Sequence, residues 1–148
     1  MNTNSHTKPV DILLVEDNPA DVTLTREALK ESKVNTTLNV TMDGEEAILY
    51  ITKKGKYIEA KTPDLILLDL NLPKKDGLTV LTEIKADPHL RRIPVIILTT
   101  STSPKDISNT YANNANCYII KPVDFREFIH VVKSIEDFWL TIAKLPTR

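Results

Sequence analysis

The sequence predicts an α/β fold in which a parallel β-sheet is covered by helices on both faces. Short apolar runs, typical of strands buried on both sides, alternate five times with segments that carry helix-start signals. Strands that alternate with helices in this way favour parallel pairing. The 148 residues, of which 41% are hydrophobic, fit one compact domain with a sizeable core.

Five segments are predicted to be strands. Four are nearly continuous apolar runs, residues 12–15, 65–68, 95–98 and 118–120. The fifth, residues 37–42, alternates polar and apolar side chains, which indicates an edge strand with one exposed face.

A helix is expected after each strand. Four of the expected helices have a capping residue at the start, namely Asn18, Asp43, Ser103 and Asp124. The remaining one follows Asp76-Gly77, where apolar residues recur at helical spacing. The last helix is predicted to run from about residue 124 to 144 because Pro146 prevents its continuation.

Composition excludes several classes of protein. The net charge is −1, from 19 basic and 20 acidic side chains, so neither nucleic acid nor a membrane is an expected partner. Cys117 is the only cysteine, which excludes an internal disulfide and fits a reducing compartment. The first residues lack the apolar core of a secretory signal, and a cytoplasmic protein is expected. We expect residues 1–8 to be flexible and residues 9–145 to form one domain, with no output domain after it.

Polar residues follow the predicted strands at the points where they end. Glu16 and Asp17 follow the first strand, Asp69 the third, Thr99 the fourth and Lys121 the fifth. In an open parallel sheet, ligands bind beyond the carboxyl ends of the strands. These side chains therefore form the candidate functional site.

The three carboxylates of this site predict a bound Mg²⁺ ion. Carboxylates crowded together repel one another unless a cation joins them, and oxygen donors without His or Cys favour a hard ion over Zn²⁺. We expect Asp17 and Asp69 to bind the ion, Glu16 to hold a water on it, and the backbone carbonyl of Asn71 to add a ligand. The ion would neutralise an incoming phosphoryl group, while the nearby lysine and threonine bind its other oxygens.

Several motifs resemble those of bacterial response-regulator receiver domains. They are Leu14-Val15-Glu16-Asp17-Asn18, Leu67-Leu68-Asp69-Leu70-Asn71-Leu72-Pro73, Asp76-Gly77, Leu98-Thr99 and Lys121-Pro122. The resemblance covers roughly residues 10–133. It implies a flavodoxin-like, doubly wound sheet of five strands in the order 2-1-3-4-5 with five helices.

The resemblance also implies a role for each site residue. Asp69 would accept a phosphoryl group from the phosphohistidine of a histidine kinase, with Mg²⁺ held by the acidic pair after the first strand. Lys121 would pair with the phosphoryl group, and Thr99 would bond it on activation. Tyr118 matches the aromatic residue that changes rotamer with the threonine. The Lys121-Pro122 peptide bond would be cis, as a proline permits.

A closer resemblance is to the response regulators that are paired with cyanobacterial phytochromes. The motifs are Leu68-Asp69-Leu70-Asn71-Leu72-Pro73-Lys74-Lys75-Asp76-Gly77, Arg92-Ile93-Pro94, Leu98-Thr99-Thr100-Ser101, Asn116-Cys117-Tyr118 and Phe138-Trp139-Leu140. This resemblance implies that the kinase partner is a light-sensing phytochrome. Two outputs stay open: direct switching of a partner, and a phosphorelay that passes the phosphoryl group to a histidine phosphotransfer protein.

The last predicted helix has more apolar residues than one buried stripe needs. Phe125, Phe138 and Ile142 are among the surplus residues, and such surplus indicates a partner surface. We expect a homodimer through the last two helices and residues 116–120. The alternative is that the tail folds back over its own domain.

Turnover of an external substrate is not expected. Haloacid-dehalogenase-type phosphatases also use an aspartate nucleophile at a strand end, but they need a second aspartate two positions later, where this chain has Asn71. A flavin carrier is disfavoured because the first loop is acidic where a cofactor phosphate would bind. The protein is therefore expected to catalyse only its own phosphorylation and dephosphorylation.

Overall fold

The structure, a computed structural model, describes residues 8–146 and shows strands and helices in strict alternation. The strands are β1 (Val10–Val15), β2 (Thr36–Thr41), β3 (Leu65–Leu68), β4 (Val95–Thr99) and β5 (Cys117–Ile120). The α-helices are α1 (Pro19–Lys30), α2 (Gly44–Ile51), α3 (Gly77–Ala86), α4 (Pro104–Ala112) and α5 (Phe125–Glu136). A short 3-10 helix, η2 (Gly55–Tyr57), follows α2, and a π-helix, η3 (Asp137–Ile142), follows α5. The flexible segment predicted for residues 1–8 lies outside the described residues except for Lys8.

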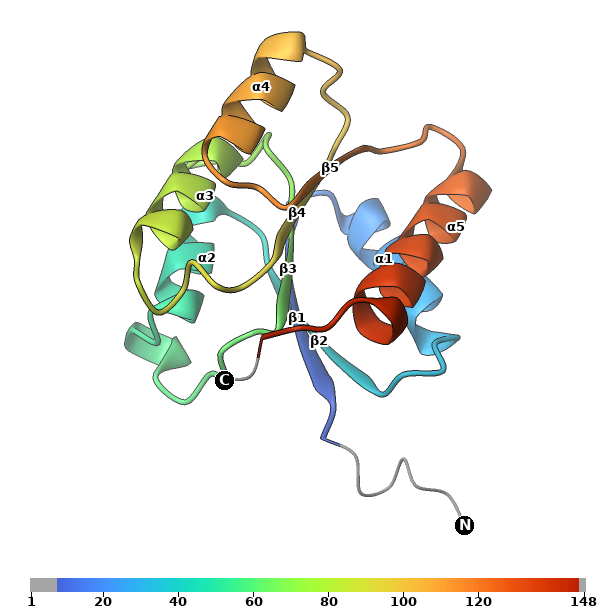
Figure 1. Cartoon of the computed structure of the whole chain (residues 1–148), viewed down its shortest axis with the longest axis horizontal. Coiled ribbons are helices and arrows are strands. Elements are labelled where there is room, and N and C mark those ends of the chain that lie inside the picture. The colour runs from blue at the N-terminus through green and yellow to red at the C-terminus, as the bar shows by residue number, and fades with distance from the viewer. Residues whose placement is uncertain (1–7, 147–148) are drawn as a thin grey trace.

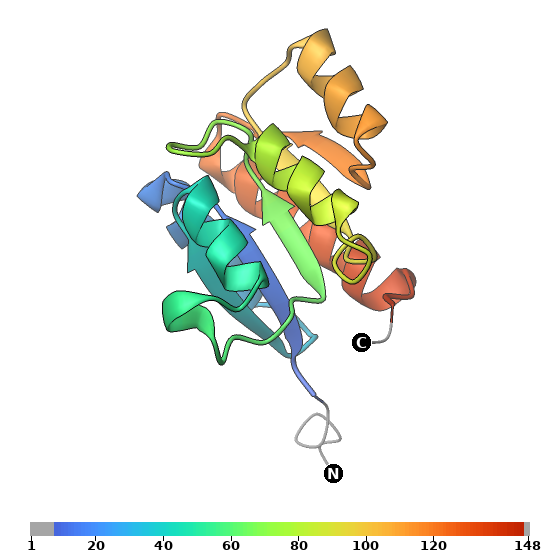
Figure 2. The same ribbon diagram turned by 90° about the vertical axis from the view of Figure 1, so that its left-hand side faces the viewer.

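The five strands form one parallel sheet in the order β2-β1-β3-β4-β5, which confirms the expected order. In Figure 1 the sheet is seen nearly edge-on, with α2, α3 and α4 on one side and α1 and α5 on the other. Figure 2 shows that α3 lies between α2 and α4 on its face of the sheet. The predicted α/β fold class is therefore confirmed.

Each face of the sheet has its own apolar core, because successive side chains of a strand point to opposite faces. Leu13 and Ile66 belong to the cluster under α2 and α3, whereas Leu14 and Leu67 belong to the cluster under α1 and α5. β3 is buried at every position, as expected for a central strand covered on both sides.

The predicted helix caps are present. The side chain of Asn18 accepts hydrogen bonds from the N–H groups of Ala20 and Asp21. The same role is played by Asp43 for α2, Ser103 for α4 and Asp124 for α5. Asp76 caps α3 in the same way. These bonds satisfy backbone donors that a helix leaves free in its first turn, and they fix where each helix begins.

Two details differ from the predictions. The last helix was expected to continue to about residue 144, and its helical path does reach Ile142, but its last six residues are π-helical and end with a bond from the Ala143 N–H to the Phe138 carbonyl. Ala143 is extended, so the helical path stops before Pro146 could end it. The Lys121-Pro122 peptide bond is trans, since no cis peptide bond occurs among residues 8–146.

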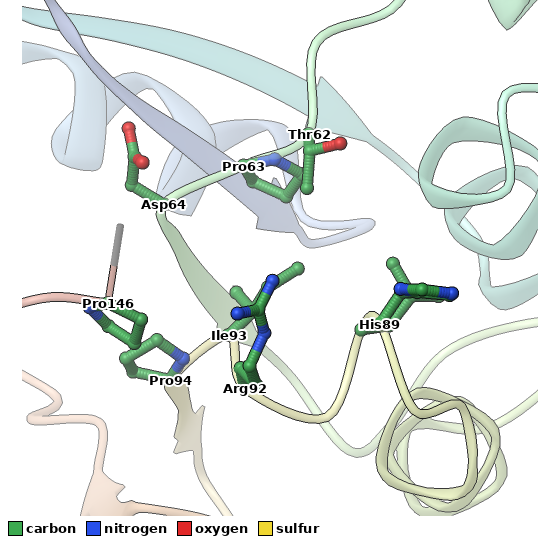
Figure 3. Close-up of a pocket in the computed structure, with 9 residues that line it drawn as sticks. Thr62, Pro63, Asp64, His89, Arg92, Ile93, Pro94 and Pro146 are labelled. Carbon is green, nitrogen blue, oxygen red and sulfur yellow. The ribbon is translucent and has the colours of Figure 1, made fainter. Parts of the chain in front are cut away.

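A cavity of about 240 Å³ lies at the amino ends of β3 and β4 (Figure 3). It is lined by residues that precede these strands, including Asp64 and Arg92, and by Pro146. None of the predicted site residues lines it, and it lies at the end of the strands opposite to the one where α/β sheets bind ligands. Among the described helices, none is both long and apolar enough to cross a membrane.

Candidate functional site

The register of the sheet brings the carboxyl ends of the strands together. Val15 in β1 pairs with Thr41 in β2 and with Leu68 in β3. Glu16 and Asp69, the residues that follow Val15 and Leu68, therefore leave the sheet side by side. Convergence of the acidic residues at one edge, which the sequence predicted, is observed.

Glu16, Asp17 and Asp69 form a carboxylate cluster. Each offers one oxygen, and these oxygens lie within 4.8 Å of one another. Glu16 and Asp69 are buried, at 2% and 6% exposure, whereas Asp17 is exposed. Burial raises the pKa of Glu16 to about 7; the hydrogen bond from Lys121 opposes this shift, and the charge of Asp69 adds to it.

Lys121 lies among these carboxylates with its side chain 4% exposed. Its Nζ is 2.5 Å from Glu16 Oε1, 2.8 Å from Asp21 Oδ2 and 3.1 Å from Asp69 Oδ2. Burial disfavours the ammonium form, but the bonds to Asp21 and Glu16 and the charge of Asp69 outweigh it and raise the pKa of Lys121. The lysine is therefore charged and serves as the counter-ion of the cluster.

Asp21 is a site residue that the sequence reasoning missed. It lies in the first turn of α1, where the helix dipole favours a negative charge, and this position alone does not indicate a site residue. The structure shows that this turn also brings the carboxylate to Lys121, which lies 100 positions along the chain. Its spacing of four residues from Asp17 is a signal that could have linked it to the strand end.

Thr99 is fully buried at the end of β4, next to β5. Its carbonyl accepts a 2.7 Å bond from the N–H of Lys121, so one backbone bond positions both predicted phosphoryl-binding residues. The Thr99 hydroxyl accepts a long 3.5 Å bond from the Ser101 N–H, and in the described part of the chain it does not bond to Asp69. Tyr118, the predicted switch residue, is half-buried and donates its hydroxyl to the Ser101 carbonyl at 2.9 Å.

Two glycines hold the loop that follows Asp69 close to its neighbours. A Cβ atom on Gly77 would lie 2.2 Å from the carbonyl oxygen of Asp69, and one on Gly44 would lie 1.8 Å from that of Lys75. Both distances are far below van der Waals contact. Within the loop, the Asn71 N–H bonds to Asp69 Oδ1 at 3.3 Å. The sequence reasoning used Gly77 to mark a helix start and as part of a family motif, and its close approach to Asp69 was missed.

This arrangement suits the binding of a hard cation beside a reactive carboxylate. The cluster contains one ammonium group, bonded to Glu16, Asp21 and Asp69, and a further carboxylate, that of Asp17, so it carries an excess of negative charge. All the donor atoms are oxygens, which favour Mg²⁺ over softer metals. Burial and the charge of Asp69 both disfavour the ionised form of Glu16, and a divalent cation at the cluster would favour it.

Comparison with known proteins agrees with the geometry. Residues 12–133 match the response regulator receiver domain. The chain is 46% identical to the response regulator Rcp1 of Synechocystis sp. over 138 residues, which are 93% of this chain and 94% of that protein. It is also 40% identical to FilR2 of Methanothrix harundinacea, a probable methanogenesis regulatory protein, over 93% of this chain and 88% of that one.

Solved structures give the same result. The crystal structure of RcpA, a phosphorylated cyanobacterial phytochrome response regulator, matches with a TM-score of 0.93 and 50% identity, covering 95% of this chain and all of that one. The Mn²⁺-bound form of Rcp1 matches with a TM-score of 0.92 and 45% identity, covering 94% of this chain and 100% of that one. The extent of these matches, together with the acidic cluster at the sheet edge, shows that this chain belongs to the response regulator receiver family.

Proposed function

We propose that this protein is a phosphorylation switch that accepts a phosphoryl group from a histidine kinase on Asp69. The observation that carries the proposal is the cluster of three carboxylate oxygens within 4.8 Å, with Lys121 bonded to two of the carboxylates. Asp69 is the member of the cluster whose carboxylate also accepts a bond from the Asn71 N–H, in the loop that follows it. Residues 9–145 would form the receiver unit, acting in the cytoplasm.

The residues present fit a Mg²⁺ ion. Glu16, Asp17 and Asp69 would hold it directly or through water, with the backbone carbonyl of Asn71 as a further ligand. Such an ion supplies positive charge that neutralises the oxygens of the transferring phosphoryl group. The Mn²⁺-bound structure of Rcp1 supports a divalent-cation site in a related protein.

Asp69 would act as the nucleophile. One of its carboxylate oxygens would bond to phosphorus as the bond to the donor nitrogen breaks, giving an acyl phosphate. Lys121 is already 3.1 Å from Asp69 and can bind a phosphoryl oxygen with little movement. The buried hydroxyl of Thr99 would turn toward the new group and bond one of its oxygens. Together these residues would supply the positioning and charge stabilisation on which phosphoryl transfer mainly depends.

We further propose that the kinase partner is a phytochrome. RcpA supports this partner because it is a cyanobacterial phytochrome response regulator. Rcp1 matches this chain to a similar extent. The similarity extends over nearly the whole chain at 45–50% identity, beyond what a shared fold requires.

A homodimer through the α4–β5–α5 face remains part of the proposal. Phe138 and Ile142 are 50% and 68% exposed, and Ile120 in β5 is 45% exposed, so part of the apolar surface of this face is not covered by its own domain. A hollow of about 490 Å³ lies between β5 and the end of α5, lined by Trp139 among others. Sedimentation at high micromolar concentration tests this point, and a monomer with and without phosphorylation would exclude the dimer.

The central experiment is an intact-mass measurement after incubation with Mg²⁺ and acetyl phosphate. We expect one added phosphoryl group in the wild type and none in Asp69→Asn. Circular dichroism of the variant controls for its fold, and omission of Mg²⁺ controls for the cation requirement. A wild type that stays folded but takes up no phosphoryl group would refute the proposal.

A further inference from the structure

Helix α4 has little apolar attachment to the rest of the molecule. Thr110 is its only buried residue, and Ile107 is half-buried. Tyr111 is 48% exposed. Since apolar burial does not hold this helix firmly, the polar contacts at its two ends decide its position.

The first of these contacts is a bond between Ser101 and Asp106. The Ser101 hydroxyl donates to Asp106 Oδ2 at 2.5 Å, and it accepts a 3.3 Å bond from the Ser103 N–H. In an ordinary capping box the acidic residue at this position would reach back to the N–H of the cap, which is Ser103 here. The hydroxyl of Ser101 stands between them instead, so the capping network of α4 includes a residue of the β4–α4 loop.

The backbone of Ser101 bonds to both residues that are predicted to respond to phosphorylation. Its N–H points to the Thr99 hydroxyl at 3.5 Å, and its carbonyl accepts the 2.9 Å bond from the Tyr118 hydroxyl. One residue therefore contacts the predicted phosphate-sensing threonine, the predicted switch tyrosine and the first turn of α4.

The second contact lies at the other end of the helix. The Tyr118 N–H donates to the Tyr111 hydroxyl at 3.1 Å. The two ends of α4 are thus connected to Tyr118, directly through Tyr111 and indirectly through Ser101. A displacement of either Ser101 or Tyr118 is expected to be felt at both ends of the helix.

There is also space for α4 to move. A hollow of about 430 Å³ separates its first turn from the loop that follows Asp69, and Asn71, Asp106 and Thr110 are among the residues that line it. Asp106 therefore has open volume on one side and the Ser101 hydroxyl on the other. A change in the Ser101–Asp106 bond can alter the position of the helix without disturbing the core.

We propose that Ser101 is a positioning residue that transmits the state of Thr99 to α4 through its hydroxyl bond to Asp106. This inference rests on the proposed function, because Thr99 is expected to move only when Asp69 is phosphorylated. The role belongs to the side chain, since the two backbone bonds of Ser101 survive its replacement by alanine.

The test compares Ser101→Ala with Ser108→Ala, a matched change at an exposed serine of α4. In the unphosphorylated protein we expect amide exchange in α4 to be ~10-fold faster in Ser101→Ala, because a bond to a carboxylate is lost. Ser108→Ala should match the wild type, and Ser101→Thr, which keeps a hydroxyl, should restore slow exchange. Unchanged exchange in Ser101→Ala would overturn the proposal.

The second readout follows the response to phosphorylation. With Mg²⁺ and acetyl phosphate, α4 exchange and the fluorine resonance of Tyr118 in 3-fluorotyrosine-labelled protein should both change in the wild type. In Ser101→Ala we expect intact mass to show the phosphoryl group and Tyr118 still to respond, but the change in the first turn of α4 to be absent, while the last turn, which Tyr111 connects to Tyr118, still changes. A wild-type α4 response in this variant would also overturn the proposal. Failure of the wild type to take up a phosphoryl group would instead refute the proposed function, and the exchange comparison in unphosphorylated protein would still stand.

Discussion

Helices α3 and α4 lie side by side on one face of the sheet, but they are held there by different forces. α3 buries Gly77, Val80, Leu81 and Ile84, whereas α4 buries only Thr110. Displacing α3 would expose apolar surface, at roughly 25 cal/mol for each Å². Displacing α4 requires only the exchange of a few polar bonds. The face therefore combines a fixed helix, which supports the Asp69 loop, with a helix that can change position.

The largest expected effect follows from the apolar anchoring of α3. Replacing the fully buried Leu81 with alanine should lower the free energy of unfolding by about 3 kcal/mol, from lost burial and the cavity left behind. Ile107→Ala in α4, where the side chain is only half-buried, should cost less than about 1 kcal/mol. Urea unfolding of both variants measures the difference. Equal costs would contradict the contrast between the two helices.

Gly77→Ala should have the next largest effect, because it forces the start of α3 away from the Asp69 loop. The new Cβ would meet the Asp69 carbonyl oxygen at 2.2 Å, so the backbone must shift, at a cost of about 2 kcal/mol. Gly55→Ala is the control: no atom lies within 4 Å of its Cβ site, and only its positive φ of 60° is unfavourable, at roughly 1 kcal/mol. Only the first variant should also weaken Mg²⁺ binding, measured by titration calorimetry. A normal Mg²⁺ affinity would show that the close approach is not needed by the site.

Lys85→Met tests whether α3 also depends on a polar anchor. The Lys85 ammonium donates to the carbonyls of Arg91 and Ile93 and to the side chain of Asn116, which ties the end of α3 to the starts of β4 and β5. Its loss should cost about 1.5 kcal/mol. The control is Lys133→Met, whose exposed ion pair with Glu31 should contribute about 0.5 kcal/mol or less. If thermal unfolding finds the two variants equal, the Lys85 anchor is unimportant.

Tyr111→Phe should have the smallest effect on global stability and a local effect on α4. It removes the acceptor of the Tyr118 N–H, a partly exposed bond that contributes about 0.5 kcal/mol. Exchange of the Tyr118 amide and of the last turn of α4 should accelerate, while the amides of α3 in the same sample should be unaffected. Acceleration in α3 as well would mean that the two helices are not independently anchored.

The sheet could be predicted from the sequence because its strands are buried on both faces and appear as continuous apolar runs. Helix starts were equally accessible, since the caps at Asn18, Asp43, Ser103 and Asp124 act on their own helices. The helical path of the last helix ends at Ile142, close to the predicted residue 144, but its change to π-helical bonding at Asp137 was not predicted, because no single residue such as Pro146 encodes it.

The site was predictable as a set of strand-end residues but not as a set of bonds. Glu16, Asp69 and Lys121 follow from the order of the strands, whereas the bond from Lys121 to Asp21 depends on where α1 places its first turn. The role inferred for Ser101 was also out of reach. It depends on which of several nearby polar groups its hydroxyl selects, and local spacing favoured a bond between Asp106 and Ser103 instead.

The two glycines beside the Asp69 loop have a consequence for how this protein can vary. Neither Gly44 nor Gly77 has a reactive side chain. At both positions, however, a Cβ atom would overlap a backbone oxygen, so no other residue fits without a shift of the backbone. In a library of random variants selected for phosphorylation, positions 44 and 77 should stay glycine as strictly as position 69 stays aspartate. Most exposed positions of α4 should accept many residues. Such a selection would identify the rigid support of the reactive carboxylate by its intolerance to substitution, without any measurement of structure.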